Sequence, residues 1–188
     1  IGITGGIGSG KSVVSRLLRI MGYSVYDTDS EAKRLMESSL EVVQKLSECF
    51  GRDIYHNGRL NRGLLSSRVF GESDKIVLLN SIVHPVVRFD FYRWSESLNE
   101  EICFVESAIL YESRFDELVD EVWTVTAPEE LRISRVRQRS GLTEEEIKKR
   151  MAAQLSEEEK QRRAAHIIWN DGNVSVIHRV LSLLKSLE

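Results

Sequence analysis

Residues Gly5–Ser12 read G-G-I-G-S-G-K-S and fit the pattern G-x-x-x-x-G-K-[ST] completely. The apolar run Ile1–Thr4 precedes this stretch, and a helical stripe of apolar residues from Val14 to Met21 follows it. A strand, a glycine-rich loop and a helix in this order are the context that the motif requires. The stretch therefore predicts a phosphate-loop NTPase fold of the α/β class.

The residues of this loop suit a nucleoside triphosphate. Glycines let successive backbone N–H groups turn towards phosphate oxygens, and the N-terminus of the following helix adds a favourable dipole. Lys11 is placed to reach the β- and γ-phosphates, and the Ser12 hydroxyl to bind Mg²⁺. No guanine-reading N-K-x-D sequence occurs in the chain, so we expect ATP. The residues assigned to ATP binding are Gly6, Ile7, Gly8, Ser9, Gly10, Lys11, Ser12 and Val13.

Strand-like and helix-like segments alternate along the rest of the chain. The apolar, strand-like runs are residues 1–4, 24–27, 102–106, 122–126 and 167–169. Strands separated by helices predict βαβ units, and hence a five-stranded parallel sheet with helices on both faces. In such a sheet the chemistry lies at the carboxyl ends of the strands.

The helical segments are less sharply bounded. We expect one helix from Thr28 to about Phe50 and only helices between 52 and 101, apart from a turn at Gly58. Pro85 is expected to begin a new helix, because proline breaks a helix when it lies inside one. The final helix is expected to bury a stripe formed by Val174, Ile177, Leu181 and Leu184.

Composition limits the class of protein. The chain has 188 residues and a net charge of −3, which fits one domain and argues against non-specific nucleic-acid binding. The two cysteines, Cys49 and Cys103, match no metal spacing and suit a reduced, cytoplasmic setting. No membrane-spanning run or basic leader is visible, and we expect a few residues to precede Ile1, which already lies in a strand-like run.

Acidic residues follow two of the predicted strands. Asp27, Thr28 and Asp29 lie where the second strand gives way to a helix, and Glu106 closes the third strand. A carboxylate at such a strand end can accept a proton from an attacking hydroxyl or order a Mg²⁺-bound water. Helix capping is the alternative interpretation of Thr28 and Asp29. A D-T-D sequence is also similar to shikimate kinases, but their Gly-Gly-Gly motif is absent from this chain.

Three arginines share one face of the helix that follows the fourth strand. Arg132, Arg135 and Arg139 are spaced by three and four residues, whereas Arg137 points elsewhere. Arginines on a helical flap can neutralise the charge that spreads over a transferring phosphoryl group. The alternative is a solvated helix face whose arginines pair with nearby acidic runs.

These stretches together resemble the dephospho-coenzyme A kinase family over nearly the whole chain. The shared sequences are I-G-I-T-G-G-I-G-S-G-K-S at 1–12, D-T-D at 27–29, L-N-R at 60–62, H-P-V-V-R at 84–88, Q-R-S-G-L-T at 138–143, R-M-A-A-Q at 150–154 and I-I-W-N at 167–170. The combination of H-P-x-x-R and R-x-A-A-Q with the phosphate loop is much more specific than the loop alone.

The resemblance implies ATP-dependent phosphorylation of the ribose 3′-hydroxyl of dephospho-coenzyme A, the last step of coenzyme A synthesis. It implies a helical coenzyme A domain at 52–101 and a helical lid at 129–163 within a single kinase domain, 1–188. Asp29 matches the essential acid of the family and is our choice for the base that also orients a Mg²⁺-bound water, with Asp27 as the other candidate base. Lys11 and Arg139 would stabilise charge, and Ser12 would hold Mg²⁺. The remaining assignments are Arg135 and Asn170 to ATP, and Asp27, Arg62, His84 and Arg88 to the acceptor.

Two alternatives stay open from the residues alone. One is another small-molecule ATP kinase, such as a shikimate or nucleoside kinase. The other is a phosphate-loop nucleotide switch without an acceptor, although a switch needs neither the D-T-D acids nor the arginine face. The expected partners are ATP and dephospho-coenzyme A, with no nucleic acid and no membrane, and the expected assembly is a monomer or weak homo-oligomer.

Overall fold

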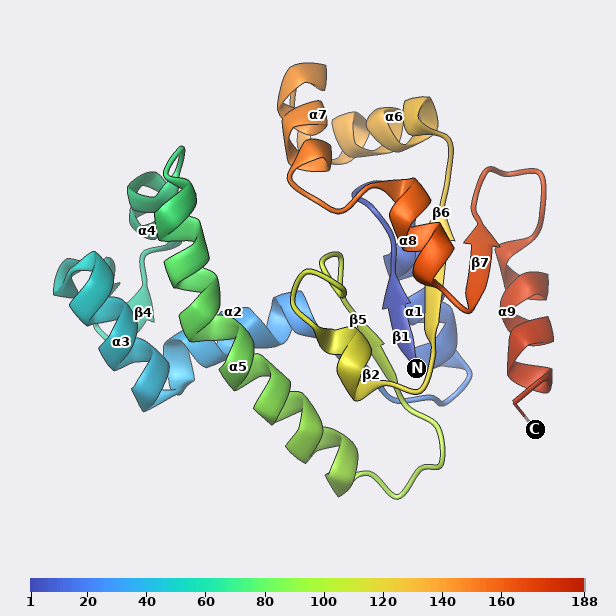
Figure 1. Cartoon of the computed structure of the whole chain (residues 1–188), viewed down its shortest axis with the longest axis horizontal. Coiled ribbons are helices and arrows are strands. Elements are labelled where there is room, and N and C mark those ends of the chain that lie inside the picture. The colour runs from blue at the N-terminus through green and yellow to red at the C-terminus, as the bar shows by residue number, and fades with distance from the viewer. Residues whose placement is uncertain (188) are drawn as a thin grey trace. The chain divides into compact units, whose positions relative to one another are not determined.

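A five-stranded parallel sheet with the order β2-β5-β1-β6-β7 carries the phosphate loop (Figure 1). Its strands are β1 (Gly2–Thr4), β2 (Val25–Asp27), β5 (Phe104–Glu106), β6 (Val122–Thr126) and β7 (His166–Trp169). The computed structural model describes residues 1–187. Because β1 is the central strand, the loop that follows it lies in the middle of the carboxyl edge of the sheet. The predicted α/β fold with a five-stranded parallel sheet is confirmed.

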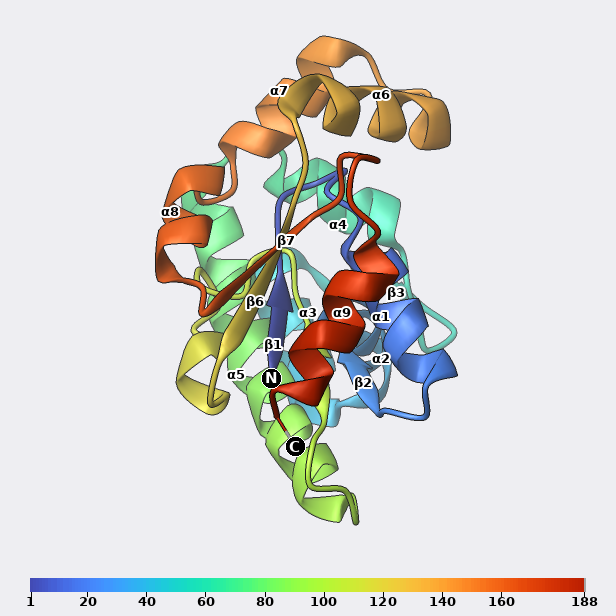
Figure 2. The ribbon, with the colours of Figure 1, turned by 90° about the vertical axis from the view of Figure 1, so that its right-hand side faces the viewer.

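Helices cover both faces of this sheet. Figure 2 shows α1 (Lys11–Ile20) and α9 (Val176–Lys185) on one side of the strands and α8 (Glu157–Arg163) on the other. Two further helices, α6 (Glu129–Ser140) and α7 (Glu144–Ala152), lie beyond the carboxyl ends of the strands. A short 3₁₀ helix, η2 (Phe115–Leu118), follows β5. These elements belong to one compact unit, residues 1–27 and 100–188.

The core of this unit is built from the strands and from α1 and α9. Ile3, Phe104 and Trp123 are fully buried, and the rings of Phe104 and Trp123 pack edge to face with centroids 5.5 Å apart. Aromatic pairs with this geometry stabilise a core by roughly 0.5–1.5 kcal/mol beyond the burial of their area.

The stripe predicted for the final helix is only partly confirmed: Leu184 is buried as expected, but two of the other three residues are exposed. Val174 precedes α9, which begins after its N-cap Ser175, and Val174 and Ile177 are 59% and 54% exposed. The helix instead buries Val180, Leu183 and Leu184 against the core. The cap sets where the helix starts, and packing on the sheet then decides which side of it faces inward.

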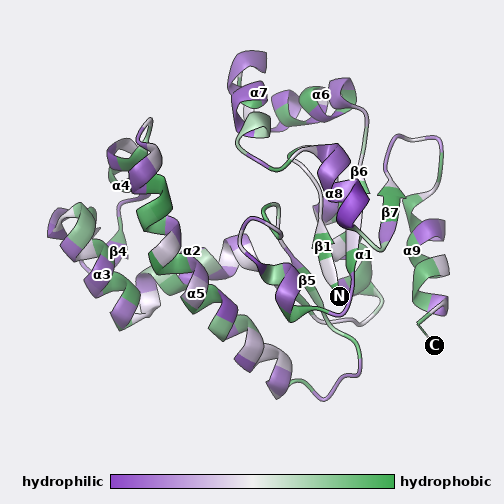
Figure 3. Ribbon diagram, viewed as in Figure 1, coloured by the Kyte–Doolittle hydropathy of each residue, from purple (hydrophilic) through white to green (hydrophobic). Residues whose placement is uncertain are grey.

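Hydropathy differs between the layers of this unit. Figure 3 shows apolar strands in the sheet, whereas α6, α7 and α8 are largely hydrophilic. Local signals set the end of α6 and the start of α7. Gly141 ends α6 with a φ of 68°, and Thr143 and Glu146 form a capping box at the start of α7. Within the part of the chain that the structure describes, no helix combines the length and the apolar character needed to cross a membrane.

Residues 28–99 form the second compact unit. It holds α2 (Thr28–Ser38), α3 (Leu40–Phe50), η1 (Arg52–Ile54), β3 (Tyr55–His56), β4 (Arg59–Leu60), α4 (Arg62–Val69) and α5 (Ser73–Ser97). The single helix predicted over 28–50 is wrong, because Ser39 adopts extended backbone and its side chain caps α3 by accepting from Val42 N. The turn predicted at Gly58 is extended by a two-residue antiparallel ladder on either side, Tyr55–His56 with Arg59–Leu60.

The predicted break at Pro85 is also wrong. Helix α5 runs for 25 residues with Pro85 inside it. Its buried residues are Ile82, Val83, Val87 and Phe91, so one apolar face continues from before the proline to after it. A proline in a helix interior costs about 3 kcal/mol. Burying four large apolar side chains outweighs that cost, at ~1.5–3 kcal/mol for each side chain.

Candidate active site

The phosphate loop is packed so closely that two of its glycines leave no room for a side chain. A Cβ placed on Gly6 would collide with the guanidinium of Arg132 and with Oε1 of Glu157. A Cβ on Gly8, whose φ is +81°, would lie 2.5 Å from the backbone oxygen of Arg132. Glycine is therefore required at Gly8 by the backbone of α6 and by its positive φ, whereas a side chain at Gly6 would have to displace the guanidinium and the carboxylate.

Lys11 begins α1, and its ammonium group folds back over the loop. Its Nζ donates to the carbonyl oxygen of Gly5 at 2.7 Å and to that of Gly6 at 3.4 Å. Lys11 is partly buried, while the neighbouring Ser12 is exposed at the first turn of the helix. The loop thus brings one cation, one hydroxyl and the N-terminus of a helix together, which is the set that binds phosphate groups.

Arg132 and Arg135 lie three residues apart on α6 and take separate partners. The side chain of Arg132 is 5% exposed, donates from Nε to the carbonyl of Ile7 at 3.0 Å, and lies 3.4 Å from the carboxylate of Glu157. Such a buried, fully engaged guanidinium braces the loop from outside. Arg132 is therefore not available to ATP in this arrangement.

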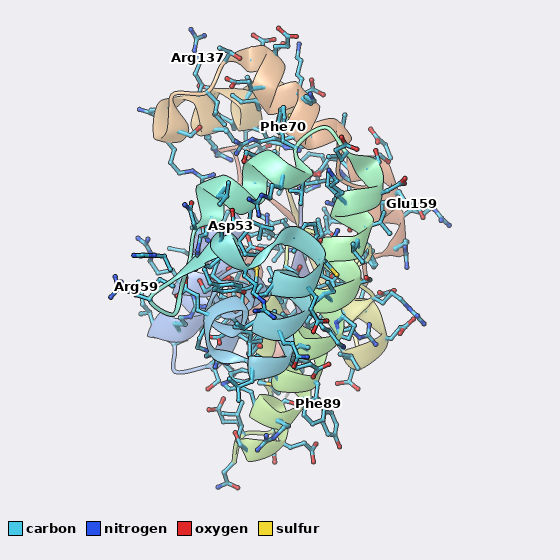
Figure 4. The ribbon with its side chains drawn as sticks, turned by 90° about the vertical axis from the view of Figure 1, so that its left-hand side faces the viewer. Asp53, Arg59, Phe70, Phe89, Arg137 and Glu159 are labelled. Atoms are coloured by element: carbon cyan, nitrogen blue, oxygen red, sulfur yellow. The ribbon has the colours of Figure 1, made fainter. Side chains whose placement is uncertain are left out.

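Arg135 and Asn170, both predicted to bind ATP, contact one another. Arg135 Nη2 donates to the carbonyl of Asn170 at 2.9 Å, and Asn170 Nδ2 donates to the carbonyl of Ser9 at 2.8 Å. The Nη1 of Arg135 is buried and has no hydrogen-bond partner within the described residues. Arg139 and Arg137 are exposed near the end of α6, and Figure 4 shows Arg137 projecting outward.

The predicted acids occupy two different kinds of position. Asp27 ends β2 and is paired in register with Glu106 at the end of β5. Asp29 lies two residues further on, in the first turn of α2, and is exposed. Carboxylate and hydroxyl oxygens are the ligands that Mg²⁺ prefers, so Ser12, Asp27 and Glu106 fit the ion chemically. Across residues 1–187, no group of three or more His, Cys, Asp or Glu side chains is arranged to hold a metal by itself.

Three of the four candidates for the acceptor side, all except Asp27, lie in the second unit. Arg62 begins α4 and donates to Glu37 at 2.9 Å and to the carbonyl of Lys33 at 3.3 Å. His84 and Arg88 are one turn apart on α5 and lie on the same helix face. Burial, and secondarily the charge of Arg88, lowers the pKa of His84.

Sequence reasoning missed two residues that bind the loop and a buried lysine on the same helical segment. Gln154 and Glu157 accept hydrogen bonds from the N–H groups of Ile7 and Gly6, at 3.0 and 2.9 Å. Lys160 is fully buried and donates to the carbonyl of Ala108 at 3.0 Å. Gln154 was visible only as the last letter of R-M-A-A-Q, and Glu157 and Lys160 belong to a charged run that is typical of a solvated helix.

The buried ammonium of Lys160 ties the start of α8 to the segment after β5. Its Nζ lies 3.9 Å from Glu112, whose carboxylate in turn accepts from the N–H of Leu155 at 2.7 Å. Burial lowers the pKa of Lys160, and the carboxylate of Glu112 partly opposes this shift. The attachment of α8 to the segment after β5 is therefore a polar network, which is more sensitive to the loss of one partner than an apolar contact.

A cavity of about 500 Å³ lies among α6, α7 and the start of α8. Residues of α6, of α7 and of the turn into α8 line it, including Arg132, Gln154 and Glu157. The side chain of Glu157 keeps 17% exposure, in keeping with its place on the cavity wall.

A parallel sheet with a phosphate loop after its central strand, and a helical segment that binds the loop through charged side chains, define a phosphate-loop kinase. The chain belongs to the dephospho-CoA kinase family: a model of that family, described as dephospho-CoA kinase, matches residues 1–175. It is thus a kinase of coenzyme A biosynthesis that phosphorylates dephospho-CoA with ATP, and the resemblance stated from the motifs is confirmed.

Individual relatives agree with this assignment. A dephospho-CoA kinase from Bacteroides fragilis is 42% identical over 188 residues, covering 100% of this chain and 92% of the relative. The crystal structure of TT1252 from Thermus thermophilus is 36% identical, with a TM-score of 0.86, and the match covers 99% of this chain and 95% of that one. A shikimate kinase from Acinetobacter baumannii shares the fold at a TM-score of 0.56 and 15% identity, with 99% and 90% of the two chains covered.

Proposed function

We propose that the chain transfers the γ-phosphoryl group of ATP to the ribose 3′-hydroxyl of dephospho-CoA. Asp29 takes the proton of that hydroxyl, the freed oxygen attacks the γ-phosphorus, and the bond from this phosphorus to the bridging oxygen of ADP breaks. The observation that carries the proposal is the phosphate loop, with Lys11 folded over it, in a chain of this family. Asp27, at the end of β2, is the alternative base.

Charge stabilisation is assigned to Lys11 and Arg139. The transferring phosphoryl group spreads negative charge over its oxygens, so cations near it lower the barrier. Gly6 to Val13, Arg135 and Asn170 are the proposed ATP contacts. The bond from Asn170 to the loop carbonyl of Ser9, and the buried unpartnered Nη1 of Arg135, support the last two.

Mg²⁺ is the proposed cofactor, held by Ser12 and, through its bound water, by the acids that follow β2 and β5. When bound, the ion neutralises charge on the β- and γ-phosphates. The hydroxyl of Ser12 is exposed at the start of α1 and therefore accessible to it.

The acceptor is assigned to the helical region around residues 52–101, through Arg62, His84 and Arg88, with Asp27 beside the phosphate loop. The second compact unit, 28–99, contains most of this range. The segment 129–163, called the lid segment below, is proposed to close over the phosphates. We place the protein in the cytoplasm as a monomer or weak homo-oligomer with small-molecule partners only, which size-exclusion chromatography tests.

A substrate panel tests the proposed function. Dephospho-CoA, shikimate and nucleosides are supplied one at a time with ATP and Mg²⁺, and the release of ADP is followed. We expect release only with dephospho-CoA, and none when Mg²⁺ is chelated. Turnover of shikimate or a nucleoside, without turnover of dephospho-CoA, would show that the chain is another small-molecule kinase. Release of ADP without any acceptor would contradict the transfer reaction.

A further inference from the structure

Three side chains of the lid segment bind three backbone groups of Gly6 and Ile7 in the phosphate loop. Glu157 accepts from the N–H of Gly6 at 2.9 Å, and Gln154 accepts from the N–H of Ile7 at 3.0 Å. Arg132 donates to the carbonyl of Ile7 at 3.0 Å and pairs with Glu157. The outer side of this part of the loop is therefore held entirely by the lid segment.

The inner side of the same backbone is held by the catalytic lysine. Lys11 Nζ donates to the carbonyl oxygen of Gly5 at 2.7 Å. That carbonyl and the N–H of Gly6 belong to one peptide unit, which is planar and trans, so the two groups point in opposite directions. Glu157 and Lys11 therefore bind the two ends of a single rigid group, and a rotation that released one would displace the other.

We propose that Glu157 is a positioning residue that acts on Lys11 through the peptide between Gly5 and Gly6. By fixing the N–H of this peptide, Glu157 aims the carbonyl that receives the Lys11 ammonium, and so sets where that ammonium stands relative to the phosphates. The inference rests on the proposed role of Lys11 in binding ATP. It gives the lid segment a second task beside supplying arginines, namely to shape the loop that it covers.

Glu157 is itself anchored well enough for this task. Its second oxygen accepts from the hydroxyl of Thr126 at 3.0 Å, and that hydroxyl in turn accepts from Gln161 at 3.2 Å. Thr126 is 2% exposed and ends β6, so its hydroxyl fixes the position of the Glu157 carboxylate relative to the sheet. Arg132 supplies the opposite charge, with a side chain that is 5% exposed.

Gln154 acts on the next peptide in the same way. The N–H of Ile7 donates to Gln154, and the carbonyl of Gly6 at the other end of that peptide receives the second, longer bond of Lys11 at 3.4 Å. Because this second bond is longer, we expect Gln154 to have a weaker effect on Lys11 than Glu157.

A double-mutant cycle on nucleotide binding tests the proposal. The dissociation constant of a fluorescent ATP analogue is measured with Mg²⁺ and no acceptor, for wild type, Glu157→Ala, Lys11→Ala and the double variant. We expect Glu157→Ala to weaken binding about 10-fold in the wild-type background and less than about 2-fold when Lys11 is already Ala, because coupled residues are non-additive. Gln154→Ala, run in the same cycle, is expected to show the same coupling with a smaller effect.

Two variants separate positioning from packing. Glu157→Gln keeps an oxygen that can accept from the N–H of Gly6, but it gives up the charge opposite Arg132 and replaces the acceptor of the Thr126 hydroxyl with a donor. Because the contact to the loop is kept, this variant is expected to stay within about 3-fold of wild type in the same titration. Glu158→Ala removes an exposed carboxylate at the next position of the helix and serves as the matched control, expected within about 2-fold. Thermal melts of all variants accompany the titrations.

A spectroscopic readout reports the contact directly. In protein labelled with ¹⁵N-glycine, the resonance of the Gly6 amide proton is expected far downfield because this proton is donated to a carboxylate. It is expected to move upfield in Glu157→Ala.

Equal weakening of nucleotide binding by Glu157→Ala in both Lys11 backgrounds, or unchanged binding in a folded Glu157→Ala protein, would overturn the proposal. If Glu157→Ala does not fold, the Gln154→Ala cycle decides in its place, and additivity there overturns the proposal. A wild-type protein that binds the analogue but releases no ADP with dephospho-CoA would refute the proposed function instead and leave the cycle interpretable.

Discussion

Asp27 and Glu106 are paired residue for residue across the neighbouring parallel strands β2 and β5. Paired residues of adjacent strands project from the same face of a sheet, so two carboxylates are offered side by side at its carboxyl end. Glu106 is also paired with Ile3, which places both acids within two strands of the phosphate loop. Asp29 lies outside this pair, on α2. The second prediction below therefore tests Asp29 and Asp27 separately as the base.

The first prediction concerns Lys11. Lys11→Ala is expected to lower turnover at least about 10²-fold, because one cation near the transferring phosphoryl group is lost. The melting temperature is expected to stay close to that of wild type, since the side chain is partly exposed and contacts loop carbonyls rather than the core. Arg16→Ala, an exposed cation on the same helix, is the control. Near-normal turnover of Lys11→Ala would remove this loop from the ATP site.

The second prediction separates the two aspartates that follow β2. Asp29→Asn is expected to lower turnover by about 10²–10⁴-fold with little change in ATP affinity, since asparagine cannot accept the proton of the ribose hydroxyl. Asparagine keeps the size of the side chain and caps helices as well, so a thermal melt should be unchanged. Asp27→Asn is expected to do less. A folded Asp29→Asn with normal ADP release, beside an inactive Asp27→Asn, would move the role of base to Asp27.

The third prediction compares two exposed arginines at the end of α6. Arg139→Ala is expected to reduce turnover with dephospho-CoA on the order of 10²–10³-fold, the usual effect of losing one charge-stabilising contact. Arg137→Ala is expected to change it less than about 2-fold, because Arg137 projects outward from the lid segment. Small and equal effects on turnover in steady-state kinetics would show that both arginines belong to a solvated helix face and do not stabilise the transferring group.

The fourth prediction is a pH dependence of stability at His84. Burial lowers the pKa of His84 below its ordinary value of 6.5, so the unfolded chain binds a proton more readily than the folded one just below that pH. Wild type is therefore expected to lose stability relative to His84→Gln as the pH falls through 6.5. Urea unfolding of both proteins between about pH 5 and about pH 7 measures the difference. Parallel curves over this range would show that His84 does not contribute.

Local signals predicted the elements that depend on neighbours in sequence. The strand–loop–helix motif at 1–21, the capping box at Thr143 and the C-terminal glycine at Gly141 all lie where the sequence places them. Each is fixed by backbone conformations and hydrogen bonds within a few residues, so no distant contact is needed to specify it.

The sequence by itself thus determined the parallel α/β sheet, the phosphate loop and the family of this protein. Only the tertiary structure decided the rest. Burial on both sides of Pro85 keeps α5 in one piece, and the packing of Val180 sets which face of α9 turns inward. Likewise, Glu157 belongs to an acidic run that is typical of a solvated helix, and it becomes a partner of the phosphate loop because α8 lies against the sheet. Contacts between residues about 150 positions apart leave no periodicity in a single sequence, since their energy arises only when the chain has closed on itself.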